Sequence, residues 1–302
     1  MSTDDGRSSY ASGLIRSIRV HQWPKNLLVA VPLMASHRFG DVHLLTNAAI
    51  AFVVFCACAS SVYLLNDLLD LDDDRKHPSK RFRPLAAGDF PVSHAIVLIP
   101  LLLAGSLAAA LVLLPFEFTL ALAIYYALTL AYSMGLKRIV MIDVIVLAML
   151  YTIRVIAGAL ATAQVVTFWL LAFCVFLFLS LAFLKRYTEL RLATGQQGNV
   201  DKYGRGYEPD DFNLLASLGC AAGYMSVLVL ALYINDASSA SLYSSQKWMW
   251  PACLVLLAWI SRAWLIAHRG RMPDDPIVFA LRDNTSRWMG LCFIAVFILA
   301  SV

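Results

Sequence analysis

The sequence predicts an all-α membrane protein: nine transmembrane helices in a single integral membrane domain over residues 1–302. Hydrophobic residues make up 60% of the chain and charged residues only 15%, whereas soluble proteins usually carry about 25%. A helix needs roughly 20 mostly apolar residues to cross the hydrocarbon. Nine segments meet this need and leave no room for a separate soluble domain: 22–37, 44–66, 92–114, 116–136, 139–162, 167–187, 212–235, 248–268 and 286–302.

The first segment, 22–37, is the weakest of the nine because Pro24 and Pro32 interrupt its helical pattern. A polar N-terminal segment, residues 1–20, precedes it and lacks the basic start, short apolar core and cleavage site of a secretory signal. The six cysteines lie inside apolar segments without metal-ligand spacing, where cysteine behaves as a small hydrophobe. We therefore expect no disulfide and no cysteine metal site.

The basic residues are distributed very unevenly between alternate links. Of the 24 Lys and Arg residues, all but Arg38, Lys247 and the helical Arg154 fall on one side of the expected membrane. The positive-inside bias places that side in the cytoplasm. We therefore expect a multi-pass protein of the plasma membrane, in contact with membrane lipids, with a cytoplasmic N-terminus and an outer C-terminus. The net charge of +4 is mainly a topology signal, and no basic-aromatic stripe suggests nucleic acid.

The second helix ends in an acidic run, Asn66-Asp67-Leu68-Leu69-Asp70-Leu71-Asp72-Asp73-Asp74. If the helix continues, Asn66, Asp67, Asp70 and Asp74 share one face. Close carboxylates repel one another, and the macrodipole disfavours negative charge at a helix C-terminus. The two penalties together favour a bound cation, and Mg²⁺ prefers such oxygen ligands.

Five basic residues follow within nine positions: Arg75, Lys76, Lys80, Arg81 and Arg83. Metal beside Lys and Arg donors suits a diphosphate, because metal bridges some oxygens and the basic groups bind others. Asp72 and Asp73 point elsewhere on the helix and are expected to be solvated. The alternative for the whole acidic run is a solvated loop.

The sixth helix also ends in charge, with Lys185-Arg186-Tyr187-Thr188-Glu189-Leu190-Arg191. Lys185 and Glu189 lie four residues apart and share a face, which fits either a structural ion pair or a functional group. The polar link 194–211 that follows is rich in Gly, Asp, Lys and Tyr and is expected to form a lid.

Asp143 and Arg154 lie within the fifth helix, and an ionisable residue at membrane depth is a functional candidate. Arg154 either pairs with a carboxylate of the helix bundle or holds an anionic substrate group. A third polar region, 272–276 with Arg282 and Asp283, is less specific. No Gly-x-Ser-x-Gly motif, Gly-rich phosphate loop or Cys-His pairing supports covalent catalysis.

The pattern Asn66-Asp67-x-x-Asp70-x-x-x-Asp74, followed by 83–88 (Arg-Pro-Leu-Ala-Ala-Gly), resembles the first signature of the UbiA-type intramembrane prenyltransferase superfamily. The resemblance implies a nine-helix bundle around a cytosol-facing cavity, in which Mg²⁺ holds a diphosphate. Members that prenylate aromatic acceptors carry a second aspartate-rich motif after helix six. Here 185–189 (Lys-Arg-Tyr-Thr-Glu) stands in its place.

Four further segments resemble one branch, the decaprenyl-phosphate phosphoribosyltransferases: 22–26, 77–84, 153–158 and 280–283. This resemblance implies transfer of 5-phosphoribose from phosphoribosyl diphosphate to a polyprenyl (decaprenyl) phosphate, a step toward arabinan donors of the cell wall. The alternatives are a polyprenyl diphosphate:aromatic acceptor prenyltransferase and, from another class, a transporter or lipid-binding protein. A homo-oligomer is compatible with the sequence.

The resemblance also implies residue roles. The metal and the donor diphosphate are assigned to Asn66, Asp67, Asp70 and Asp74, of which the three aspartates, with Lys185, are the expected catalytic residues. The other expected substrate-binding residues are Lys25, Lys80, Arg81, Arg83, Asp143, Arg154, Arg186, Tyr187 and Glu189.

Overall fold

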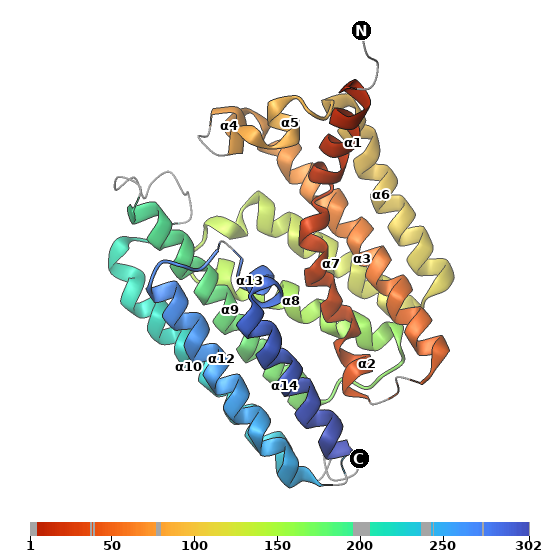
Figure 1. Ribbon diagram of the computed structural model, residues 1–302. Helices are drawn as coiled ribbons and strands as arrows, with labels where there is room; N and C mark the ends of the chain where they lie inside the picture. Colours follow the sequence, from red (N-terminus) through yellow and green to blue (C-terminus); the bar gives the residue numbers. More distant parts are fainter. Residues whose placement is uncertain are drawn as a thin grey trace. The chain divides into compact units, whose positions relative to one another are not determined.

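The computed structural model describes residues 5–36, 38, 40–76, 80–195, 206–236, 243, 245–273 and 275–301, and every regular element among them is a helix (Figure 1). The chain forms two compact units. Unit 1 comprises Met1–Met134 and Ile153–Val165, and unit 2 comprises Gly135–Thr152 and Val166–Val302. Helix α8 (Ile142–Ala161) therefore gives its first half to unit 2 and its second half to unit 1.

Unit 1 is built around α3, which is buried over most of its apolar window. Before the second half of α8, unit 1 contains, in chain order, α1 (Asp5–Ser17), η1 (Val20–Ala30), α2 (Val31–Ala35), α3 (Val42–Leu69), α4 (Leu71–Lys76), η2 (Lys80–Phe82), α5 (Pro84–Ala87), α6 (Val92–Leu113) and α7 (Phe116–Met134). Helix α3 packs against η1, α6 and α7. The Asp41 carboxylate caps its N-terminus by accepting hydrogen bonds from the backbone N–H groups of His43 and Leu44.

The segment expected as the first membrane helix is not one continuous α-helix. Residues Val20–Ala30 form a 3-10 helix, η1, and the short α2 follows. Pro24 lies inside η1, where it removes a backbone donor. This segment approaches α8 very closely: a Cβ built on Gly158 would lie 1.9 Å from the Val29 carbonyl oxygen. Gly158 therefore permits a backbone contact that any side chain would block.

Unit 2 is a set of long helices that pack in sequence. After η3 (Leu136–Arg138) and the first half of α8, it contains α9 (Phe168–Gly195), η5 (Pro209–Asp211), α10 (Phe212–Ile234), η6 (Gln246–Met249), α12 (Trp250–His268), α13 (Pro276–Arg282) and α14 (Asn284–Ser301). Helix α10 packs against α9 and α12, and α12 packs against α14. A hydrogen bond from Ser180 Oγ to the Gly219 carbonyl, 2.7 Å long, joins α9 to α10.

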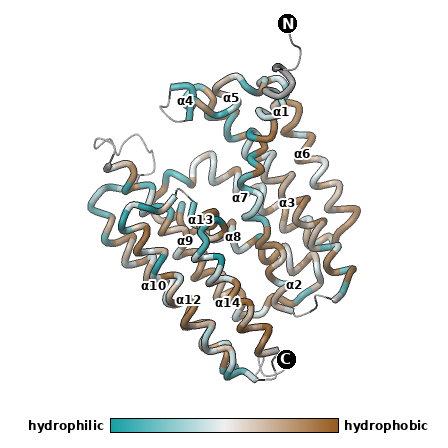
Figure 2. Tube along the Cα trace, in the orientation of Figure 1, coloured by the Kyte–Doolittle hydropathy of each residue, from teal (hydrophilic) through white to brown (hydrophobic). Residues whose placement is uncertain are grey.

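Seven helices of the described chain are long and apolar enough to cross a membrane: α3, α6, α7, α8, the long apolar part of α9, α10 with η5, and α12 with η6. Figure 2 shows their predominantly hydrophobic course. An eighth apolar helix, Asn284–Ala300, is shorter. The all-helical class is thus confirmed, while the total of nine spans and the cytosol-facing cavity stay predictions.

Candidate active site

The aspartate-rich run of unit 1 does not form one continuous helix, so the condition on which Asn66 to Asp74 were expected to share one face is not met. Helix α3 ends at Leu69 because the backbone of Asp70 leaves the helical region, with φ −92° and ψ 10°. Helix α4 begins at Leu71 and carries Asp74. The Asp74 N–H still donates to the Asp70 carbonyl, at 2.8 Å, and this bond keeps the two helices in register.

Two of the four predicted metal ligands are nonetheless brought together, by a shared arginine. Asp67 and Asp74 are each 2% exposed, and their carboxylates accept hydrogen bonds from Arg83 Nη1 at 3.1 and 2.7 Å. Asp67 also pairs directly with Arg19. Buried carboxylates need a cationic partner. In this structure arginine meets the need that the sequence attributes to a metal. Asp72 and Asp73 are exposed, as expected.

The chemistry of the oxygen donors fits Mg²⁺. Asn66 Oδ1 is buried and has no hydrogen-bond partner among the described residues. Amide and carboxylate oxygens are ligands of hard cations, and Mg²⁺ retains waters and binds substrate phosphates as well. In the described part of the chain, however, no three His, Cys, Asp or Glu side chains converge as a ready metal cage. A metal here would share the Asp67 and Asp74 carboxylates with Arg83.

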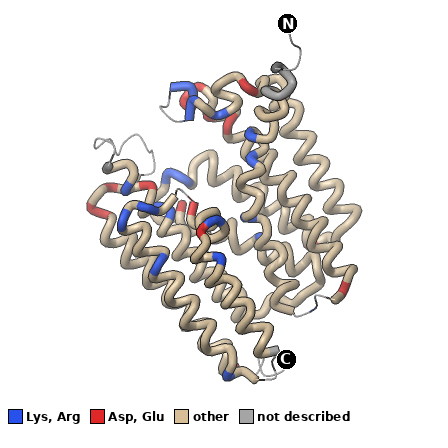
Figure 3. The backbone as a smooth tube through the Cα atoms, viewed as in Figure 1, with Lys and Arg blue, Asp and Glu red and all other residues tan. Residues whose placement is uncertain are grey.

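A pocket of about 370 Å³ opens beside the buried Asp67 in unit 1. It is lined by Arg16, Arg19, His21, Asp67, Phe82, Arg83 and Pro84. The lining brings three arginines together with one buried carboxylate, so the pocket suits an anion with several oxygens. Figure 3 shows a group of basic and acidic residues around α4 and α5, with other charged residues of this unit elsewhere along its helices. Sequence reasoning missed Arg16, Arg19 and His21, which lie outside the two motifs.

Arg19 occupies this pocket in an uncommon backbone conformation. Its φ of 53° and ψ of 50° lie in the left-handed region, which is unfavourable for a residue with a side chain. The guanidinium lies 5.1 Å from the ring centroid of Tyr63 and pairs with Asp67. This turn between α1 and η1 thus directs a strained residue at the buried carboxylate.

The other predicted cations of unit 1 are dispersed. Lys25 and Arg154 are buried. Arg154 Nε donates to Asn26 Oδ1 at 3.0 Å, and its Nη2 donates to the Tyr125 hydroxyl at 2.9 Å. These contacts connect η1, α7 and α8, and the substrate role of Arg154 stays a prediction. Lys80 and Arg81 are exposed on η2.

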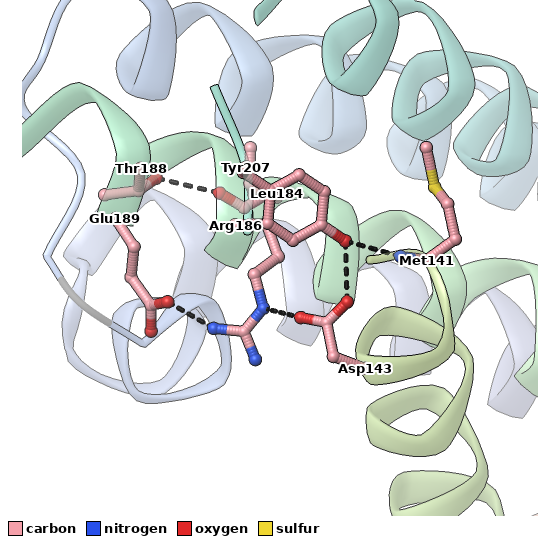
Figure 4. Close-up of polar contacts among 7 residues, drawn as sticks. All are labelled: Met141, Asp143, Leu184, Arg186, Thr188, Glu189 and Tyr207. Carbon is pink, nitrogen blue, oxygen red and sulfur yellow. Dashed lines mark hydrogen bonds and ion pairs between the residues drawn. The ribbon is translucent and has the colours of Figure 1, made fainter. Parts of the chain in front are cut away.

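Unit 2 holds a separate buried cluster around Arg186 (Figure 4). Arg186 Nε donates to Asp143 and its Nη1 donates to Glu189, and the side chains of Arg186 and Asp143 are 1% and 0% exposed. The Tyr207 hydroxyl donates to the second oxygen of Asp143, at 2.6 Å, and accepts from the Met141 N–H at 3.0 Å. Burial, together with the adjacent Asp143 carboxylate, raises the pKa of Tyr207, so the phenol stays protonated.

The charged residues 185–191 lie within the last turns of α9. Glu189 accepts from Arg186 at i,i+3, so the face that Glu189 shares with Lys185 is not its only ionic environment. The Tyr187 hydroxyl lies 3.2 Å from His268 Nδ1. Most of the expected lid, 194–211, lies outside the described residues. Its described end includes Tyr207, whose contact with Asp143 had no local signal in the sequence.

Most of the chain matches a known protein family. The model of the UbiA prenyltransferase family matches residues 26–284. The chain belongs to the UbiA prenyltransferase family. It is therefore a transferase of UbiA type, and with its seven apolar helices it is an integral membrane protein.

Several relatives cover most of this family member. An uncharacterised protein, y4nM of Sinorhizobium fredii, is 37% identical over 95% of the chain, and the chain spans 55% of that protein's length. The nodulation protein NoeC of Azorhizobium caulinodans is 38% identical, over 89% of this chain and 86% of NoeC. The decaprenyl-phosphate phosphoribosyltransferase of Mycobacterium tuberculosis is 34% identical, over 95% of this chain and 94% of that enzyme.

Solved structures support the fold. A UbiA homologue from Archaeoglobus fulgidus, bound to GPP and Mg²⁺, superposes with a TM-score of 0.68 at 19% identity, covering 96% of this chain and all of that one. Both predicted resemblances, to the UbiA superfamily and to its phosphoribosyltransferase branch, are confirmed.

Proposed function

We propose that this protein transfers 5-phosphoribose from phosphoribosyl diphosphate to a polyprenyl (decaprenyl) phosphate and releases diphosphate. The observation that carries the proposal is the pocket of unit 1, where Arg19 and Arg83 bind the buried Asp67 and Arg16 adds to the basic lining. A pocket with three guanidiniums beside oxygen donors for a metal favours a diphosphate over a neutral ligand. The likeness to decaprenyl-phosphate phosphoribosyltransferases supports the choice of sugar donor and lipid acceptor.

The chemistry needs little from the protein beyond charge and position. An oxygen of the lipid phosphate forms a bond to the anomeric carbon of ribose, and the bond from that carbon to the diphosphate breaks. The attacking phosphate is already anionic, so no strong general base is required. Stabilising the leaving diphosphate and aligning the two reactants supply the rate enhancement.

Each residue set of unit 1 has a part in this proposal. Asn66, Asp67, Asp70 and Asp74 would hold Mg²⁺, which supplies charge to the diphosphate oxygens when bound. Arg83 and Arg19 exchange the carboxylate oxygens of Asp67 for diphosphate oxygens. The exposed Lys80 and Arg81, and the buried Lys25 and Arg154, are assigned to substrate phosphates.

The unit 2 residues are assigned on chemistry as well. Lys185, Arg186 and Tyr187 are assigned to the sugar 5-phosphate or the lipid phosphate, with Asp143 and Glu189 for the ribose hydroxyls. Because Arg186 is buried between two carboxylates, it also fixes the positions of Asp143 and Glu189. The basic bias of alternate links supports a cytoplasmic location for these groups and for the N-terminus, at the plasma membrane.

A prenyl transfer to an aromatic acceptor is the second candidate. The structural relative from Archaeoglobus fulgidus is bound to GPP, a prenyl diphosphate, which favours it. The two can be separated with purified protein and Mg²⁺. Label moving from phosphoribosyl diphosphate to a polyprenyl phosphate supports our proposal. Label moving instead from a prenyl diphosphate to an aromatic acid would overturn it.

A narrower experiment tests the metal assignment. Asp74→Asn is expected to lower activity about 10- to 100-fold, the usual cost of a weakened metal site. Asp72→Asn is the matched control, because Asp72 lies two residues away on the same short helix with its side chain 88% exposed. Equal activity of the two folded variants at limiting Mg²⁺ would contradict the assignment.

A further inference from the structure

Helix α1 contacts both ends of the segment 82–89 of unit 1 through Arg16. Arg16 Nη2 donates to the Phe82 carbonyl at 3.0 Å, and Arg16 Nη1 pairs with Asp89 Oδ2 at 3.2 Å. Between these two acceptors lies the stretch that begins with Arg83 and includes the short helix α5. One guanidinium therefore bridges the two ends of the segment that carries Arg83.

Close packing gives this bridge a second, independent support. A Cβ built on Gly13 of α1 would lie 2.4 Å from the Asp89 carbonyl oxygen, so helix and segment touch backbone to backbone. Near the start of the helix, the Tyr10 hydroxyl lies 3.0 Å from His94 Nδ1, and the Tyr10 ring packs on Phe90. Leu14 packs against an apolar cluster that includes Leu64, Leu85 and Phe90, with Ala95 and Ile99.

The position of Arg83 depends on this arrangement. Arg83 reaches both Asp67 and Asp74 through a single nitrogen, so a small displacement of its backbone would lengthen both contacts. Arg83 is also the residue next to Phe82, whose carbonyl Arg16 binds. Three backbone hydrogen bonds support the segment locally: Arg83 N–H to the Lys80 carbonyl, Ala87 N–H to the Arg83 carbonyl, and Phe90 N–H to the Pro84 carbonyl.

We infer that Arg16 is a positioning residue: through the Phe82 carbonyl and Asp89, it fixes Arg83 where it can exchange carboxylate oxygens for diphosphate oxygens. The replacement of carboxylate oxygens by diphosphate oxygens at Arg83 rests on the proposed function, whereas the fixation of the segment does not. Arg16 acts by geometry more than by stability, because its ion pair with Asp89 is 53% and 39% exposed and exposed pairs contribute little to folding.

The test combines two measurements on the full-length protein in detergent. Hydrogen exchange of the amides of 83–90 is followed by mass spectrometry in wild type, Arg16→Gln and the control Arg38→Gln. Arg38 pairs with Asp41 at similar exposure, 57% and 32%, far from this segment in sequence. Loss of the bridge is expected to speed exchange about fivefold in Arg16→Gln, the effect of roughly one lost hydrogen bond to a charged group at the surface, and not in the control.

The second measurement is the binding of inorganic diphosphate with Mg²⁺, by calorimetry. Arg16→Gln is expected to bind about fivefold more weakly, and Arg16→Lys to recover only part of the loss, since an ammonium cannot reproduce the planar fork. Gly13→Ala, which displaces the Asp89 carbonyl without changing any charge, is expected to accelerate exchange in the same segment.

The outcomes separate the inference from the proposed function. Unchanged exchange at 83–90 in both Arg16→Gln and Gly13→Ala overturns the inference whatever the ligand. Faster exchange with unaltered diphosphate binding overturns the role of Arg16 in positioning Arg83. If wild type itself binds no diphosphate, the proposed function fails, and the exchange data still decide whether α1 fixes the segment.

Discussion

The buried ion cluster of unit 2 gives a prediction whose size follows from burial. Arg186 is the cation for two carboxylates, of which Asp143 is fully buried and Glu189 is partly exposed. Arg186→Met removes the cation but keeps much of the aliphatic volume. It leaves the Asp143 carboxylate in the interior without its guanidinium partner, hydrogen-bonded to the neutral Tyr207 hydroxyl. Removing one partner of a buried ion pair costs about 3–5 kcal/mol of the free energy of unfolding.

The same substitution at a more exposed ion pair provides the comparison for this loss of stability. Arg262→Met breaks the pair of Arg262 with Asp283, whose side chains are 29% and 22% exposed, and is expected to cost about 1 kcal/mol or less. The double variant Arg186→Met with Asp143→Asn removes the unpaired charge, so it should be more stable than the two single effects predict by about 2 kcal/mol.

The assay is unfolding of the purified variants in mixed micelles with increasing denaturing detergent at neutral pH, followed by circular dichroism. The reasoning is refuted if Arg186→Met is no less stable than Arg262→Met. It is refuted equally if the effects at Arg186 and Asp143 simply add, because additivity would mean that the two charges do not depend on one another.

Two further predictions concern backbone packing and pH. Gly158→Ala places a methyl group against the backbone of η1 and is expected to cost about 1–3 kcal/mol of stability in the same unfolding assay, whereas Gly105→Ala, which meets open space, should be neutral or slightly stabilising. Hydrogen bonds from Arg262 lower the pKa of Asp283 to about 2, so the stabilising contribution of Asp283 is full above its unfolded-state pKa of about 4 and is lost as the pH falls toward 2. Thermal unfolding between pH 5 and 2 should lose stability more steeply in wild type than in Asp283→Asn, and parallel curves would contradict the assignment.

Much of the fold could be predicted because a membrane imposes one strong rule on sequence. The segment 92–114 was expected and Val92–Leu113 is observed, because long apolar runs can satisfy their backbone groups in lipid only as helices. The 3-10 form of η1 could not be predicted in the same way. It depends on Pro24 and on the close approach of Gly158, which is more than a hundred residues away in the chain.

In the candidate site too, the features set by local sequence could be predicted and those set by long-range contacts could not. The residue types of the acidic run predicted a need for positive charge, since that need follows from local spacing and from the helix end. Local spacing did not predict which residue supplies that positive charge. Arg19 lies 48 residues from Asp67, and Tyr207 lies 64 residues from Asp143. Neither distance leaves a periodic signal, so pairs of this kind are visible only once the chain is folded.

The arginines that neutralise Asp67 and Asp74 also bear on how metal and diphosphate bind. Metal alone would place a cation beside the Arg83 guanidinium, which already binds both carboxylates, whereas diphosphate alone meets two buried carboxylates of its own charge sign. When both ligands bind, each lowers the free-energy cost of binding the other, because the carboxylates bind the metal and the Arg83 guanidinium binds the phosphate oxygens. We therefore expect Mg²⁺ to tighten the binding of inorganic diphosphate at least about fivefold in calorimetry, a coupling of about 1 kcal/mol or more, and linkage requires the reverse effect to be equal. Independent binding of the two would show that the Arg83 guanidinium and the metal do not oppose one another at these carboxylates.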